Sequence, residues 1–184
     1  MLAMKRIIIV GTTGCGKSVL AEKLSQKFAL SVTDLDDLYW QPGWIPVSLD
    51  EFVHKVDKAT SSPAWIISGN YSRLRDLVWE RADTVIWLDY GFWLIMHQLL
   101  IRSVSRVINK TPVCNGNIET WKRLFSKDSI LIWMLKSFTK KRREYGTLTN
   151  DRSNFAQISF FRLHSPADTE KFLESLGDTN PIGE

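Results

Sequence analysis

The chain has 184 residues, of which 44% are hydrophobic and 24% are charged, and its formal net charge is +4. These values are typical of one globular domain that has a sizeable core and room for an inserted segment. The modest positive charge suits an anionic ligand and falls far short of the dense Lys/Arg tracts of dedicated DNA-binding proteins.

Cysteine content and hydrophobic runs restrict the cellular setting. The two cysteines, Cys15 and Cys114, exclude a disulfide framework and favour a reduced compartment. The apolar run that follows Lys5 and Arg6 is too short for a signal peptide. The most apolar helix candidates, 91–101 and 129–135, are too short to span a membrane. We therefore expect a cytoplasmic protein with no membrane association.

Residues 11–18 read GTTGCGKS and match the phosphate-loop pattern G-x-x-x-x-G-K-[ST]. An apolar strand pattern at 5–10 precedes them and a helical pattern at 17–29 follows, which is the context that the motif requires. The glycines allow backbone N–H groups to point at phosphate oxygens, and the helix adds its positive end. The residues expected to bind ATP are Gly11, Thr12, Thr13, Gly14, Cys15, Gly16, Lys17, Ser18 and Val19.

Within the loop, Lys17 is expected to reach the outer phosphates and the Ser18 hydroxyl to ligate Mg²⁺. The alternative is a glycine-rich turn between a strand and a helix that binds nothing.

Short apolar runs alternate with helical patterns along the rest of the chain. The predicted strands are 5–10, 31–33, 64–68, 84–89 and 157–163. The predicted helices are 17–29, 49–60, 72–82, 91–108, 128–144 and 166–177, with an acidic turn at 34–37, a loop at 38–46, a connection with partial helix at 109–127 and a polar loop at 146–154. This alternation predicts an α/β fold with a parallel sheet, whose ligands bind beyond the carboxyl ends of the strands.

Acidic residues follow the second predicted strand. Asp34 and Asp36 are two residues apart, so on an extended strand end their side chains would point the same way. Beside a phosphate loop, one carboxylate can order the water ligands of Mg²⁺ while the other accepts a hydrogen bond from an acceptor hydroxyl. The alternative is a solvated acidic turn.

Several stretches together resemble the P-loop nucleoside-monophosphate-kinase-like proteins, and most closely the bacterial group known as DNA topology modulation or adenylate-kinase-related proteins. The matching stretches are 11–18, 35–44, 65–72 and 81–89, with Arg102 and Arg106. The resemblance implies one domain over 1–184, with a three-layer P-loop NTPase fold, a five-stranded parallel sheet and a helical lid insertion at about 102–145. It also implies a kinase, a transferase that uses ATP and Mg²⁺ and acts as a monomer.

The resemblance also distributes roles over the chain. It makes Lys17, Asp36, Arg102 and Arg106 the catalytic candidates, with the arginines closing over the transferred phosphoryl group. Asp36 is the first candidate for the acceptor contact or base, and Ser18 and Asp34 are the metal candidates. The candidates for acceptor binding are Asp36, Tyr39, Trp40, Trp44, Asn70, Tyr71 and Arg73. The alternatives are core packing for the aromatic residues and solvated faces for the arginines.

Two departures from this group concern its acidic strand ends. The group commonly has an aspartate where this chain has Ser68, and Pro-Arg where this chain has Tyr90 and Gly91. The first acid normally helps to hold Mg²⁺ through water, so its absence gives Asp34 and Asp36 more weight. These changes point to altered metal handling or weakened catalysis.

Two other functions are compatible with the sequence. The chain can instead be a nucleotide-dependent regulator or a nucleic-acid-associated P-loop ATPase with slow hydrolysis, or a P-loop protein that binds nucleotide for structure only. Residues 140–143 read KKRR and are expected at the C-terminal end of a helix, where the dipole favours positive charge. A second lid clamp or a nucleic-acid contact is the alternative for this run.

Overall fold

A five-stranded parallel sheet organises the computed structural model, which describes residues 4–150 and 155–177. The strands lie in the order β2-β5-β1-β6-β9, so the strand that leads into the phosphate loop is central. Their bounds are β1 Arg6–Gly11, β2 Val32–Asp34, β5 Trp65–Ser68, β6 Thr84–Leu88 and β9 Ser159–Leu163. All five predicted strands are therefore present, with ends that differ by one or two residues.

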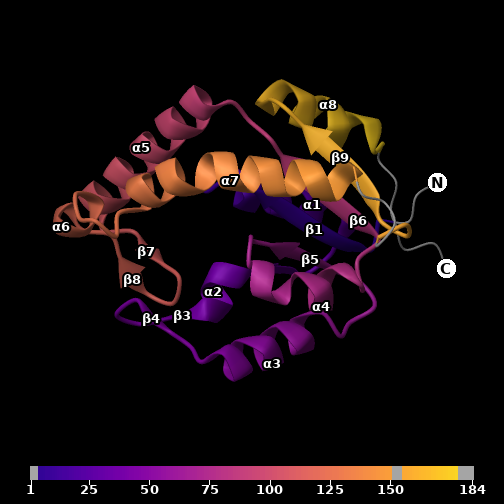
Figure 1. The fold of residues 1–184 in the computed structure, drawn as a ribbon, viewed down its shortest axis with the longest axis horizontal. Coiled ribbons are helices and arrows are strands. Elements are labelled where there is room, and N and C mark those ends of the chain that lie inside the picture. Colours follow the sequence, from indigo (N-terminus) through magenta and orange to yellow (C-terminus); the bar gives the residue numbers. More distant parts are fainter. Residues whose placement is uncertain (1–3, 151–154, 178–184) are drawn as a thin grey trace.

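Helices cover both faces of this sheet (Figure 1). They are α1 Lys17–Phe28, α2 Leu35–Tyr39, α3 Leu49–Ala59, α4 Arg75–Trp79, α5 Phe92–Asn109, α6 Trp121–Leu124, α7 Ile130–Asn150 and α8 Pro166–Ser175. Two small hairpins complete the described fold, β3 Trp40–Gln41 with β4 Ile45–Pro46, and β7 Pro112–Val113 with β8 Asn117–Ile118. Among the described residues, no helix has the length and apolar composition of a membrane span.

The sheet separates two hydrophobic cores because side chains alternate along each strand. On β1, Ile7 and Ile9 join the core beneath α1, α5 and α8, while Ile8 packs with α3 and α4. Helix α7 contributes Met134 to the first core and Tyr145 to the second, so it passes from one face of the sheet to the other. This arrangement confirms the predicted three-layer α/β fold class.

The acidic turn predicted at 34–37 is wrong in its geometry. Asp34 is the N-cap of α2, and its Oδ1 accepts a hydrogen bond from the backbone N–H of Asp36 at 3.0 Å. A capping aspartate starts a helix at the next residue. Asp34 and Asp36 therefore do not share an extended strand end, and their carboxylates belong to a strand end and a helix turn respectively.

Four other local predictions also need correction. The segment 72–82 is a 3₁₀ turn, Ser72–Leu74, followed by the short helix α4. Helix α7 continues to Asn150, because Tyr145 and Leu148 pack in the second core. The KKRR run at 140–143 therefore lies inside the helix and not at its end, and 146–150 is not a loop. Residues 151–154 of that predicted loop lie outside the described residues.

The two hairpins dock on each other, although the residues that bond, Asn117 and Trp44, are 73 positions apart in the chain. Asn117 is only 4% exposed, and its Nδ2 donates to the carbonyl oxygens of Gln41 at 2.9 Å and Cys114 at 2.5 Å. Its Oδ1 accepts the backbone N–H of Trp44 at 2.7 Å. The Arg123 guanidinium lies 4.3 Å from the centre of the Trp44 ring. The connection between α5 and α7 is thus fastened to the tryptophan loop.

We expect Asn117→Ala to lower the free energy of unfolding by about 2 kcal/mol, because it leaves buried backbone groups without partners. Urea denaturation measures this change. The control is Asn109→Ala, which removes an exposed amide bonded to the Ser105 hydroxyl and should cost less than about 0.5 kcal/mol. Equal losses in the two variants would contradict this account of the docked hairpins.

Candidate functional site

The phosphate loop lies at the carboxyl end of the central strand β1 and runs directly into α1. Gly14 has φ +87°, and a Cβ built there would lie 3.0 Å from the Leu99 Cβ, so α5 packs closely on the loop. Gly16 is the N-cap of α1, and no described side chain caps this helix start. Its first turn carries no acidic residue either. The first N–H groups of α1 therefore remain directed at an incoming anion.

Of the other residues in this segment, Lys17 bonds to the loop backbone, Cys15 is buried, and Thr13 and Val19 are at least partly exposed. The Lys17 Nζ donates to the carbonyl oxygens of Gly11 at 3.0 Å and Thr12 at 3.3 Å, which holds the ammonium over the loop. Cys15 is fully buried, and burial raises the pKa of its thiol, so Cys15 packs as a neutral side chain. Thr13 is partly exposed and Val19 is 60% exposed.

The two predicted metal candidates meet at the ends of β2 and α1. The Ser18 hydroxyl donates to the Asp34 Oδ2 at 3.1 Å, and the Ser68 hydroxyl donates to the same oxygen at 3.4 Å. Asp34 and Ser68 are paired in the β2–β5 register. An aspartate is therefore present on the strand next to position 68, although position 68 itself is a serine. Burial and then the nearby Asp36 raise the pKa of Asp34.

This donor set fits Mg²⁺ on chemical grounds. A hydroxyl and a carboxylate are the hard oxygen ligands that Mg²⁺ prefers, and a cation would offset the burial of the Asp34 charge. Within residues 4–150 and 155–177, no group of three or more His, Cys, Asp or Glu side chains is placed to hold a metal ion. Ser18 and Asp34 would supply two of the ligands, and phosphate oxygens and water would supply the others.

Asp36 is exposed on α2 and is oriented by Tyr71. The Tyr71 hydroxyl donates to the Asp36 Oδ1 at 2.6 Å. Burial and the Asp36 charge raise the pKa of Tyr71, so its phenol stays protonated and serves as a hydrogen-bond donor. Tyr39 packs against Tyr71 and Phe52, with ring centres 5.0 Å and 5.1 Å away. The structure thus brings three predicted acceptor residues together as one cluster.

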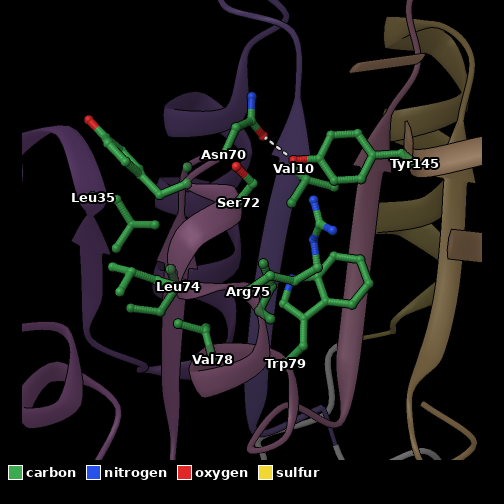
Figure 2. A pocket seen from close by; sticks show the side chains of 13 residues that line it. Val10, Leu35, Asn70, Ser72, Leu74, Arg75, Val78, Trp79 and Tyr145 are labelled. Carbon is green, nitrogen blue, oxygen red and sulfur yellow. Dashed lines mark hydrogen bonds between the residues drawn. The ribbon is translucent and has the colours of Figure 1, made fainter. Parts of the chain in front are cut away.

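The other acceptor candidates lie outside this cluster, and their surroundings differ from one another. Trp40 and Trp44 are partly exposed, with ring centres 5.9 Å apart, and Trp44 is also held by the docked hairpin. Arg73 is exposed on the 3₁₀ turn. Asn70 turns its amide toward Tyr145 (Figure 2), and the same amide is hydrogen-bonded to Gly11. Asn70 is therefore engaged with the protein, while the tryptophans and Arg73 retain exposed surface.

The two predicted lid arginines lie on α5, the helix that packs on the phosphate loop through Leu99. Arg102 follows Leu99 by three residues, which places both on one side of the helix. Burial and then the neighbouring Arg106 lower the pKa of Arg102, and its buried Nε has no hydrogen-bond partner among the described residues. The Arg106 Nη1 donates to the Glu119 Oε1 at 3.0 Å. The Glu119 partner of Arg106 was not predicted from the sequence.

Asp89 forms a buried ionic cluster that the sequence indicated only in part. It is 5% exposed and accepts from the Arg162 Nη2 at 2.6 Å, while the Arg142 Nε lies 3.0 Å from its other oxygen. The Nδ1 of His164 lies 3.6 Å away. A buried acid at a strand end requires a cationic partner. The KKRR run, which contains Arg142, was the feature of the sequence from which this partner could have been predicted. This cluster ties α7 to β6 and β9 at the carboxyl edge of the sheet.

Comparisons with known proteins support the fold. No protein-family model and no curated protein sequence matches this chain. A gluconokinase from Sinorhizobium meliloti 1021 matches with a TM-score of 0.50 and 14% identity, covering 96% of this chain and 97% of that one. A sugar kinase from Janibacter sp. HTCC2649 gives 0.50 and 16%, covering 94% and 92%. A shikimate kinase from Bacteroides thetaiotaomicron gives 0.52 and 12%, covering 94% and 96%.

At 12–16% identity a structural match carries the fold alone. These similarities therefore show that this chain shares the α/β fold of the three matched structures over nearly its whole length. They are consistent with the resemblance to P-loop kinases that the sequence indicated. The likeness to the DNA topology modulation group rests on the sequence motifs.

The raised pKa of Asp34 predicts how stability depends on pH. The folded state holds this proton more tightly than the unfolded state, so ionisation of Asp34 lowers the free energy of unfolding as pH rises from about 4. Asp34→Asn removes this cost, and we expect the variant to be more stable than the wild type at pH 7. The difference should shrink toward pH 4. Urea denaturation across this range measures it, and a difference that grows on acidification would contradict the assignment.

Proposed function

We propose that this chain transfers a phosphoryl group from ATP to a small-molecule acceptor, as a P-loop kinase of the nucleoside-monophosphate-kinase type. The observation that carries the proposal is the uncapped start of α1 at the end of β1. The Lys17 ammonium lies over this loop and Asp34 is hydrogen-bonded beside it. Phosphoryl transfer depends mainly on such positioning and on charge stabilisation. We further propose that the protein is a cytoplasmic monomer.

Each part of the proposed site has a distinct task. The loop N–H groups and Lys17 bind the phosphates, and Mg²⁺ held by Ser18 and Asp34 would neutralise their charge. Asp36, oriented by Tyr71, accepts the proton of an acceptor hydroxyl. Arg102 offsets charge on the transferred group. The segment at about 102–145 acts as the lid, and its closure excludes water from the site.

The acceptor lies, in this proposal, between Asp36 and the exposed surface of Trp40, Trp44 and Arg73. Its reacting group is a hydroxyl or a phosphate oxygen near Asp36, and Arg73 is available for an anionic group. The similar structures are a gluconokinase, a sugar kinase and a shikimate kinase, so hydroxylated acids and sugars join nucleosides and nucleoside monophosphates as acceptors to test. A panel of these compounds with ATP and Mg²⁺, followed by ADP release, identifies the class.

A second candidate function follows from the charge of one segment. Residues 92–150 contain eleven Lys and Arg residues but only three Asp and Glu residues, whereas the whole chain has 24 and 20. A basic insertion of this kind favours a nucleic-acid-associated ATPase. A salt-titrated DNA-binding assay separates the two functions. The kinase proposal expects affinity weaker than about 1 μM at physiological salt, and a tight complex with a steep salt slope would favour the ATPase.

We expect Lys17→Ala to lower ATP turnover by more than about 100-fold, because it removes the point charge at the outer phosphates. Its circular dichroism spectrum should match the wild type. The control is Lys23→Ala on the same helix, which removes an exposed lysine 2.5 Å from Glu170 and should retain turnover within about twofold. Unchanged turnover in purified Lys17→Ala would reject the catalytic assignment.

A further inference from the structure

The amide of Asn70 clamps the first residue of the phosphate loop. Its Oδ1 accepts the backbone N–H of Gly11 at 3.1 Å, and its Nδ2 donates to the Gly11 carbonyl oxygen. The regular β5 strand ends at Ser68, and the Gly69 N–H still donates to the carbonyl of Ile9 at 3.2 Å. The Asn70 side chain thus extends the bonding between β5 and β1 beyond the end of the backbone ladder.

Tyr145 on α7 also bonds to this amide. Its hydroxyl donates to the Asn70 Oδ1 at 3.0 Å, as Figure 2 shows. Tyr145 is only 3% exposed, and its ring lies 5.9 Å from the Trp87 ring and 6.5 Å from the Trp79 ring, measured between centres. Burial raises the pKa of Tyr145, so the phenol remains a donor. The ring is therefore fixed, and its hydroxyl fixes the Asn70 oxygen.

The same clamp reaches Lys17 through one carbonyl group. The Gly11 carbonyl oxygen accepts from both the Asn70 Nδ2 and the Lys17 Nζ. Gly11 has φ +147°, and a Cβ built there would lie 2.6 Å from the carbonyl oxygen of Leu88. The Gly11 backbone is therefore packed against β6, and both its N–H and its carbonyl group are bonded to Asn70. The orientation of the Gly11 carbonyl group affects where it holds the Lys17 ammonium.

We propose that Asn70 and Tyr145 are positioning residues, which set the backbone conformation at Gly11 and through its carbonyl group the direction of the Lys17 ammonium. The inference rests on the proposed phosphoryl transfer and adds a regulatory link to it. Most of α7 lies within the proposed lid, and Tyr145 is at the end of that segment. The seating of α7 on the second core therefore couples the lid to the phosphate-binding loop. A shift of α7 changes the support of Gly11 without touching the nucleotide.

The test compares two buried tyrosine hydroxyls. Tyr145→Phe removes the bond to Asn70, and the matched control Tyr90→Phe removes the bond between Tyr90, which is 4% exposed, and the Thr169 hydroxyl, 2.5 Å away. Both variants should lose similar stability, since each loses one buried hydrogen bond. Only Tyr145→Phe should weaken ATP affinity, by about three- to tenfold in calorimetry. It should also move the Gly11 amide signal in a ¹H–¹⁵N spectrum, which Tyr90→Phe should leave in place.

A double-mutant cycle completes the experiment. Asn70→Ala should weaken ATP binding more than Tyr145→Phe does, and adding Tyr145→Phe to it should change little more, because the accepting oxygen is already gone. Equal ATP affinity in Tyr145→Phe and Tyr90→Phe, with an unmoved Gly11 signal, would overturn the inference while leaving the proposed function intact. A wild-type chain that binds no ATP would instead refute the proposed function and this inference together.

Discussion

The start of helix α1 carries backbone N–H groups that no described side chain caps. These groups need a hydrogen-bond acceptor, and the other residues of the candidate site lie around them. The helices α3, α6 and α8 each begin with a Ser or Thr side chain that accepts a backbone N–H. Helices α1 and α5 both begin at a glycine without a side-chain cap, Gly16 and Gly91, and α1 differs in that the Lys17 ammonium is held over the loop before it. Uncapped N–H groups and the helix dipole both favour an anion at this point. The loop keeps its shape because its first residue, Gly11, belongs to β1 and because α5 packs against Gly14.

Charges of both signs are held near this loop in surroundings that disfavour them. Burial raises the pKa of Asp34, and burial together with Arg106 lowers the pKa of Arg102. Perturbed titratable groups of this kind cluster at functional sites, although structural ion pairs perturb pKa values too. A bound phosphate chain with its metal ion would relieve both groups at once, since it offers negative charge to Arg102 and positive charge to Asp34. In the proposed function, one ligand would therefore offset two separate electrostatic penalties.

The sequence predicted what local pattern determines and missed what distant contacts determine. The phosphate loop followed from a motif, and the five strands followed from apolar runs that alternate with helical patterns. Ser18 and Asp34 were each predicted as metal candidates, but the hydrogen bond between them was not predicted. The capping role of Asp34 was missed because this residue is both the last residue of β2 and the N-cap of α2, and the strand pattern alone was considered. The docking of Asn117 and the extension of α7 to Tyr145 depend on residues far apart in the chain, for which no periodic signal exists.

The central claim is that the amide groups at the start of α1, together with Lys17, bind the phosphates of a nucleotide. Calorimetric titration of the wild-type chain with ATP, with and without Mg²⁺, tests it most directly. The account predicts saturable heat with 1:1 stoichiometry and an affinity that depends on Mg²⁺. The absence of heat from ATP and every other purine triphosphate, with or without the metal, would contradict it.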